Sequence, residues 1–252
     1  MWNMNKIKNI IVLLALMPLC AWANEDKLQQ AATLYAQRSY EEAATIYAEL
    51  LNQGESADLY YNYANACFKL GRTAEAILNY ERALKLNPRH ADARFNLEYA
   101  NTQITDKIDP VPTFFFRKWL RDLGSQLSSD QWAVLSVSLF GATLVLALLF
   151  IFGRFVALRK TAFFMGIVAL LLSLISMAYA FSRKRYMQEH TEAIVMAGSV
   201  TVASAPDRSG TELFVLHDGT KVILTDSVGE WREIRISDGQ TGWVPRTAIE
   251  PI

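Results

Sequence analysis

Few side chains in this sequence stand at the spacing that catalysis or metal binding requires. The three histidines, His90, His190 and His217, fall in three separate segments, and none has Cys, Asp or Glu at the spacing of a usual metal-ligand motif. The sequence contains no nucleophile motif and no phosphate-cradling glycine loop, and its Asp and Glu residues are scattered as on a solvated surface. We therefore predict that the protein is not an enzyme, with no catalytic residue, no cofactor and no metal.

The two cysteines provide no disulfide framework, because Cys20 lies in an N-terminal export signal and Cys67 would be the one thiol left after cleavage. Cys67 also falls on a packing position of the helical repeat described below. This position favours a buried structural thiol over a redox centre.

Residues 1–23 have the parts of a secretory signal peptide. These parts are two lysines, an apolar core and a small-x-small cleavage site: Lys6 and Lys8, Ile10 to Leu19, and Ala21-Trp22-Ala23. Cleavage would leave Asn24 as the first residue. A lipoprotein signal acylated at Cys20 is the alternative, but Leu19 is bulkier than the small residue expected before a lipidated cysteine.

Two runs without any charged residue, 132–152 and 161–182, are each about 30 Å long as helices at about 1.5 Å per residue, long enough to cross a bilayer. The intervening segment 153–160 is short, so we predict an antiparallel hairpin. Arg and Lys flank both ends equally, so the positive-inside rule does not orient this hairpin. The export signal orients it instead. We predict an inner-membrane protein with both soluble parts in the periplasm and a cytoplasmic turn over 153–160.

Two linkers flank the hairpin, 108–131 and 183–191. The first contains Pro110 and a run of aromatic and basic residues from Phe114 to Arg121, a mixture that suits the lipid headgroup layer. We interpret this run as an interfacial elbow, with a binding motif as the alternative.

Residues 57–88 have the spacing of two antiparallel helices, in which small residues allow close approach and large ones fill the gaps. The positions that carry this spacing are Tyr60, Tyr63, Ala64, Cys67, Gly71, Ala76, Tyr80, Ala83, Leu84 and Pro88. The same classes recur one repeat earlier, from Ala31 to Leu51, with Arg38 in place of the turn glycine. The pattern resembles tetratricopeptide (TPR) repeats. We predict two repeats and a capping helix over 24–107, the third unit losing its second helix from Asp106 onward.

In TPR arrays the first helices line a groove that takes an extended peptide, and an Asn at the place of Asn62 and Asn96 can bond the peptide backbone. The resemblance therefore makes Asn62, Asn65 and Asn96 candidates for partner binding, with solvated helix residues as the alternative. Leu28 and Asp92 stand where carboxylate clamps carry lysine, which argues against a chaperone-tail receptor.

From Glu192 onward the periodicity changes to six short strand-like runs with turn signals between them. These runs are 193–196, 200–202, 213–216, 221–224, 231–236 and 241–244. Asp238-Gly239 suits a tight hairpin turn. With Thr241-Gly242-Trp243-Val244, this order resembles bacterial SH3-type domains, so 192–252 should form a small β-barrel. Trp231 and Trp243 could present a binding face, with a core position for Trp243 as the alternative.

The whole order of segments resembles the BatE proteins of the Bacteroides aerotolerance (Bat) operon. The resemblance implies a multidomain membrane protein with all-α TPR hairpins, a two-helix transmembrane hairpin and an all-β SH3-like barrel. It also implies protein partners in an aerotolerance or stress complex, among them membrane proteins with von Willebrand factor A domains. The soluble segments 24–109 and 186–252 are acidic, which disfavours nucleic acid as a partner.

Two functions of different class follow from this organisation. The first is a non-catalytic scaffold of the cell envelope whose TPR groove binds protein partners. The second is a wall sensor whose SH3-like domain binds peptidoglycan or a wall peptide, with the TPR units as a spacer. Loss of partner binding on changing Asn62 and Asn96 to Ala would favour the scaffold, and retention of purified wall by residues 190–252 would favour the sensor.

Overall fold

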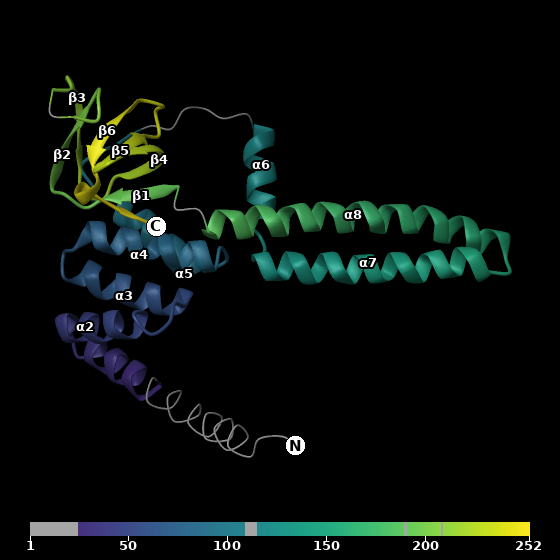
Figure 1. Cartoon of the computed structure of the whole chain (residues 1–252). Coiled ribbons are helices and arrows are strands. Elements are labelled where there is room, and N and C mark those ends of the chain that lie inside the picture. Colours follow the sequence, from purple (N-terminus) through teal and green to yellow (C-terminus); the bar gives the residue numbers. More distant parts are fainter. Residues whose placement is uncertain (1–24, 109–114, 189–190, 208) are drawn as a thin grey trace, which may run out of the picture.

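The structure is a computed structural model that describes residues 25–108, 115–188, 191–207 and 209–252. It consists of a helical array, a hairpin of two long helices and a seven-stranded antiparallel sheet, which is the predicted fold class (Figure 1). The predicted signal peptide 1–23, Pro110 and His190 lie outside the described residues.

The helical array begins with a helix over residues 25–36. Four further helices follow: α2 (Tyr40–Leu51), α3 (Ala57–Lys69), α4 (Thr73–Leu86) and α5 (Ala91–Asn101). The helices approach closely because the small residues of the repeat, Ala64, Ala76 and Ala83, are fully buried between them. Gly71 has φ +77° at the turn between α3 and α4, whereas Arg38 adopts φ +67° at the matching turn, a conformation that costs a non-glycine residue about 1 kcal/mol or more.

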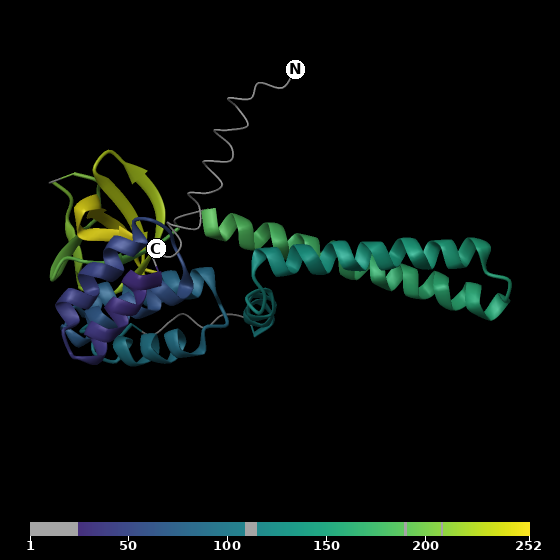
Figure 2. The same cartoon turned by 90° about the horizontal axis from the view of Figure 1, so that it is seen from below.

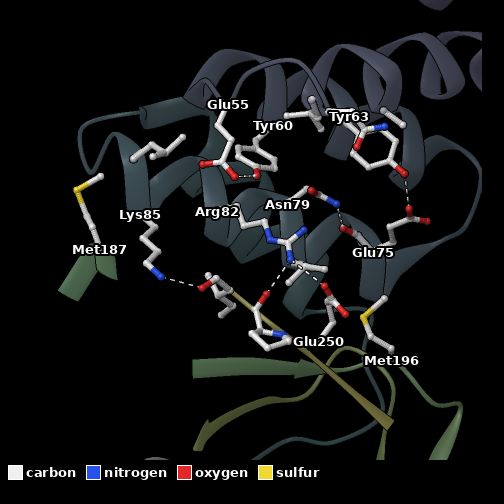
Figure 3. A pocket seen from close by; sticks show the side chains of 17 residues that line it. Glu55, Tyr60, Tyr63, Glu75, Asn79, Arg82, Lys85, Met187, Met196 and Glu250 are labelled. Carbon is white, nitrogen blue, oxygen red and sulfur yellow. Dashed lines mark hydrogen bonds and ion pairs between the residues drawn. The ribbon is translucent and has the colours of Figure 1, made fainter. Parts of the chain in front are cut away.

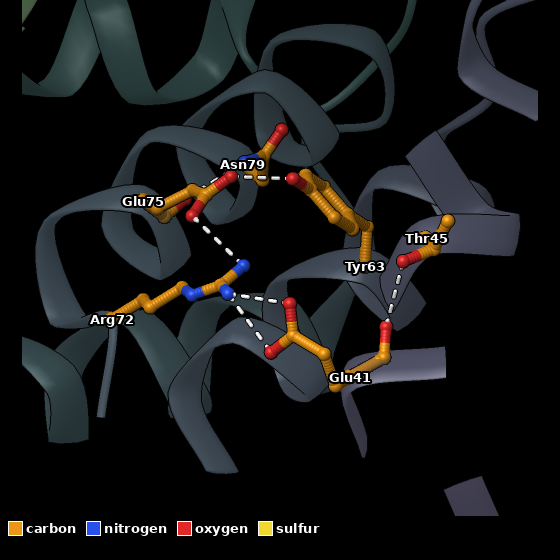
Figure 4. A network of polar contacts seen from close by, with 6 residues as sticks. All are labelled: Glu41, Thr45, Tyr63, Arg72, Glu75 and Asn79. Carbon is orange, nitrogen blue, oxygen red and sulfur yellow. Dashed lines mark hydrogen bonds and ion pairs between the residues drawn. The ribbon is translucent and has the colours of Figure 1, made fainter. Parts of the chain in front are cut away.

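A polar network joins the first repeat to the second (Figure 4). The Arg72 guanidinium donates to both oxygens of Glu41 at 2.6 and 2.8 Å and lies 4.0 Å from Glu75. Glu75 in turn accepts a hydrogen bond from the Tyr63 hydroxyl. Because Arg72 and Glu41 are both substantially exposed, we attribute orientation rather than much stability to this network.

The hairpin consists of α7 (Ser129–Phe152) and α8 (Val156–Gln188), both long and apolar enough to cross a membrane. Ser136 Oγ donates to the Ser173 carbonyl and Ser173 Oγ to the Ser136 carbonyl, both at 3.0 Å, so the two helices are joined by reciprocal buried bonds.

Both segments that flank the apolar part of α8 are more helical than predicted. The turn 153–160 is shorter, because α8 already begins at Val156, and the linker 183–191 is helical as far as Gln188. The charges of Arg183, Lys184 and Arg185 end the apolar run, but these residues are good helix formers and do not end the helix.

The linker 108–131 contains a helix of its own, α6 (Phe115–Gly124), which lies crosswise to the hairpin at the end where α7 begins (Figures 1 and 2). Trp132 Nε1 donates to the Gly124 carbonyl at 3.0 Å, and the Trp132 ring stacks on Tyr179 at 4.9 Å. The Tyr179 hydroxyl donates to the Leu120 carbonyl at 3.3 Å. These contacts hold α6 across the end of the hairpin.

The C-terminal sheet has seven strands in the order β3-β2-β6-β5-β4-β1-β7. They are β1 (Glu192–Val195), β2 (Ser199–Ala203), β3 (Glu212–His217), β4 (Lys221–Val228), β5 (Trp231–Arg235), β6 (Thr241–Pro245) and, after a 3-10 turn (Arg246–Ala248), β7 (Ile249–Pro251). Gly239 has φ +95° between β5 and β6, which confirms the predicted hairpin turn. The strand β7 was not predicted, because three residues ending in proline carry no alternating pattern.

The SH3-like domain packs against the helical array through α4 and the segment after α5. Ile194 and Ile252 share a buried cluster with Ile77 and Tyr80. The Asp106 carboxylate accepts bonds from the His217 backbone N–H and the Thr220 hydroxyl, both at 2.7 Å, and lies 2.8 Å from His217 Nδ1. Burial acts to raise the pKa of Asp106, but these bonds outweigh it and lower the pKa below its usual value. The domain therefore occupies the place where the third repeat loses its second helix.

Candidate functional site

The facing sides of α3 and α5 carry a surface of amide and aromatic side chains. Tyr61, Asn65 and Phe68 follow one another along α3 at spacings of four and three residues, so they share a stripe of that helix. Asn96 and Tyr99 face them from α5, since the Phe68 and Tyr99 rings meet edge to face at 5.7 Å. We call these five residues the α3–α5 surface.

Asn65 is the centre of this surface. Its Oδ1 accepts bonds from the Tyr80 hydroxyl at 2.6 Å and from Asn96 Nδ2 at 2.8 Å. The structure thus brings together two of the three predicted asparagines. The third, Asn62, lies one helical turn earlier on α3, half-buried and without a side-chain hydrogen bond to the described part of the chain.

The pairing leaves one donor and one acceptor of the two amides available. Asn65 Nδ2 and Asn96 Oδ1 make no bond with the described residues, and an amide can both donate and accept. An extended peptide presents the complementary C=O and N–H groups along its backbone. The arrangement can therefore hold a peptide backbone without recognising its sequence.

Aromatic rings accompany the amide pair. Tyr99 on α5 is 55% exposed, and Tyr61 on α3 packs against the rings of Tyr80 and His90. Aromatic rings bury much apolar area in a complex and are enriched at binding hot spots. Sequence reasoning chose the asparagines but missed Tyr61, Phe68 and Tyr99, although their helical spacing next to Asn65 and Asn96 was available as a signal.

The two described histidines have structural partners. His90 Nδ1 accepts from the Ala93 N–H at 3.2 Å and caps α5, while His90 Nε2 lies 3.3 Å from Asp58. His217 belongs to the Asp106 contact between the two soluble modules. In the described ranges, no three His, Cys, Asp or Glu side chains gather at a spacing that could hold a metal ion.

Cys67 lies on α3 and is fully buried inside the helical array. Burial, together with the Glu75 carboxylate, raises the pKa of its thiol to about 12. Since the thiolate is the reactive form, we expect Cys67 to remain unmodified by iodoacetamide at pH 7 in the folded protein and to react fully in denaturant. Intact-mass measurement of both samples checks this expectation. Rapid alkylation of the folded protein would instead support a redox role.

A cleft of about 1000 Å³ lies between the array, the end of α8 and the SH3-like domain (Figure 3). Arg82 and Lys85 line the side of this cleft that faces the C-terminal residues of the SH3-like domain. Arg82 donates to Glu250 at 3.1 Å and to the Pro251 carbonyl at 2.7 Å, and Lys85 donates to the Ile252 carbonyl at 2.8 Å. These contacts tie β7 to α4, so the cationic groups of the cleft are engaged in docking the SH3-like domain.

The SH3-like domain presents a second aromatic face. In the β5–β6 ladder Trp231 lies opposite Pro245, and Trp243 lies opposite Glu233. Both tryptophans are half-buried, and neither belongs to the core that the described residues form around Val202, Ile234 and Val244. The structure therefore places Trp243 on a surface and not in the core.

Two family matches correspond to the two soluble modules. The family described as TPR repeat matches residues 64–101, and the family described as bacterial SH3 domain matches residues 198–250. Modules of these kinds support roles in protein interaction or wall binding.

Two curated proteins share a short similar stretch with the chain. Protein O-mannosyl-transferase TMTC1 of Homo sapiens is 55% identical over 42 residues, which are 17% of this chain and 5% of that protein. The TMTC1 protein of Mus musculus is also 55% identical over 42 residues, 4% of its length. Because the chain spans so little of these relatives, the transferase activity in their names applies to those proteins and not to this chain.

Proposed function

We propose that the chain is a non-catalytic scaffold of the bacterial inner membrane, of the BatE kind, which holds a protein partner on the α3–α5 surface. In this proposal both soluble modules face the periplasm, α7 and α8 anchor them, and residues 153–155 form the cytoplasmic turn. The partner is a membrane protein with a von Willebrand factor A domain, in a complex for aerotolerance or stress.

The amide pair of Asn65 and Asn96 beside the exposed Tyr99 ring is the observation that carries this proposal. An exposed aromatic ring next to amide groups that can still donate and accept suits a bound peptide. The anchoring supports it further, because α8 runs without a break from the apolar run into the array: the Arg183 guanidinium donates to the Lys85 carbonyl at 3.3 Å. A partner in the same membrane would thus meet the surface at a fixed height.

Changing both Asn62 and Asn96 to Ala should reduce capture of the partner about tenfold or more, since each lost backbone bond is worth about 1 kcal/mol. Asn62 makes no bond within the described chain, and Asn65 Oδ1 keeps the bond from the Tyr80 hydroxyl when Asn96 is replaced, so the fold should survive. The measurement is affinity capture from gently solubilised membranes, with protein identification. The matched control is Asn52→Ala with Asn101→Ala, two exposed asparagines away from the surface. Equal capture by both double variants would contradict the scaffold.

A second candidate function, wall binding, is favoured by the outward placement of Trp231 and Trp243 beside Pro245. Flat rings on a sheet surface can pack against a sugar ring or a wall peptide. Retention of the full chain on purified peptidoglycan, lost in Trp231→Ala with Trp243→Ala and kept in the asparagine variants, would make the protein a wall sensor.

A further inference from the structure

A cavity of about 440 Å³ lies between the N-terminal end of α5 and the residues that lead into α7. It is lined by Pro88, Arg89, Ala91, Arg94, Phe95, Glu98, Ser125 and Gln126. We call it the α5–α7 pocket. The residues come from the helical array and from the linker between α6 and α7, so the pocket exists only when these two parts are packed together.

The pocket contains two arginines without an acidic partner among the described residues. Arg89 and Arg94 are exposed, and Arg94 donates one bond to the Pro88 carbonyl at 2.5 Å. Glu98 is the acid at the rim, and within the described ranges it forms no ion pair with either arginine. The start of α5 carries Asp92 in its first turn, so the positive charge of the lining comes from the two arginines. The lining is therefore net positive and suits an anion that a planar guanidinium can bind at two oxygens.

The pocket lies at the level where the apolar part of the hairpin ends. Ser125 and Gln126 precede α7 by a few residues, and Ser129 Oγ donates to the Ala180 carbonyl at 3.1 Å, just before the charges that follow Ser182 on α8. The stacked pair of Trp132 and Tyr179 marks the same level, as aromatic rings do at the boundary of a bilayer. An anion in the pocket would thus stand in the headgroup layer.

An apolar group accompanies the cations. The Phe95 ring lines the pocket beside Arg94 and is 70% exposed. Soluble phosphate gains nothing from contact with this ring, whereas a lipid brings a phosphodiester and an acyl chain together.

We propose that the α5–α7 pocket binds the phosphodiester headgroup of an anionic phospholipid through Arg89 and Arg94. The inference rests on the proposed membrane placement of α7 and α8. The lipid holds the end of the helical array against the bilayer, which fixes the direction in which the α3–α5 surface faces.

The test uses the full chain, purified in a non-ionic detergent, with native mass spectrometry to count bound lipid. Short-chain phosphatidylglycerol should bind tighter than phosphatidylcholine. Arg89→Gln with Arg94→Gln should weaken phosphatidylglycerol binding about thirtyfold, because each cation near an anionic headgroup contributes about fivefold to the affinity. The matched control, Lys69→Gln with Arg246→Gln, removes the same charge from exposed positions elsewhere and should bind as the original chain does.

Equal phosphatidylglycerol binding by the pocket and control variants would overturn the proposal. So would displacement of the lipid by inorganic phosphate at equal concentration, which would assign the pocket to a soluble anion. Carbonate extraction of membranes containing each variant tests the anchor separately, and partner capture tests the scaffold. Lost partner capture with lipid binding retained would therefore contradict the scaffold and leave the pocket standing.

Discussion

Replacing Gly219 with valine is expected to release the SH3-like domain from the helical array. Gly219 lies in the turn between β3 and β4 with φ +87°, and its N–H donates to the Val195 carbonyl at 2.8 Å. A Cβ added there would stand 2.5 Å from Ile104 Cγ2 and 3.2 Å from Ile77 Cδ1. The left-handed backbone costs valine about 1–2 kcal/mol, and the forced overlap adds about 1–3 kcal/mol.

The matched control for this change is Gly229→Val. Gly229 also has a positive φ, +54°, in the turn between β4 and β5, but a Cβ there would meet nothing within 4 Å. Hydrogen exchange of β1, β7 and α4 should therefore rise strongly in the Gly219 variant and stay near the original level in the Gly229 variant. The same rise in both would show that backbone strain, and not contact with the array, sets the effect.

The elements of this fold were predictable because their patterns are local. Ala64, Cys67 and Ala83 sit at positions that the repeat spacing marks as small or packed, and all are fully buried. The two long helices were predictable in the same way, from uncharged runs of residues that are long enough to cross a bilayer. In the candidate site, the asparagines were predictable from their positions in the repeat, because residues at the same repeat position point in the same direction from their helices.

The docking of the two soluble modules was not predictable from these patterns. Asp106 appeared only as the point where a repeat ends, and the His217–Thr220 turn only as part of a domain motif, yet 111 residues separate Asp106 from His217. Periodicity reports which face of an element is buried but not what covers it. The continuation of α8 beyond the apolar run was likewise not predictable from the pattern, because a run of charged residues ends an apolar segment without ending a helix.

The second large effect is expected for Lys221→Met, because Lys221 is the charge at which the array, α8 and the sheet meet. Its Nζ lies 2.9 Å from Glu81 Oε2 on α4 and 3.1 Å from Glu192 Oε2 on β1, and the Tyr186 hydroxyl of α8 donates to the same Glu192 oxygen at 2.7 Å. Removing the lysine leaves two carboxylates facing each other. A fully buried pair would lose about 3–5 kcal/mol on such a change. The Lys221 side chain is 35% exposed, so we expect about 1–3 kcal/mol.

The stability that this cluster contributes should fall at both high and low pH. Burial acts to lower the pKa of Lys221, but Glu81 and Glu192 outweigh it and raise the pKa, so the stabilisation is present below the unfolded lysine value of about 10.4 and is lost as pH rises through the folded value. Burial acts to raise the pKa of Glu192, but Lys221 and Tyr186 lower it overall, so its contribution holds above about pH 4.3 and is lost as pH falls through the folded value.

The cluster should therefore stabilise the chain across the neutral range, and urea unfolding at pH 7 should show the full loss in Lys221→Met. Lys27→Met is the matched control, since its ion pair with Glu49 is exposed on both sides and should contribute at most about 1 kcal/mol. Adding Glu81→Gln and Glu192→Gln to Lys221→Met should recover much of the loss, because the unpaired charges then disappear. If the triple variant is no more stable than Lys221→Met alone, the lysine acts through packing of its stem, and the three modules are joined by apolar contact around Ile194 and Ile77 instead of by charge.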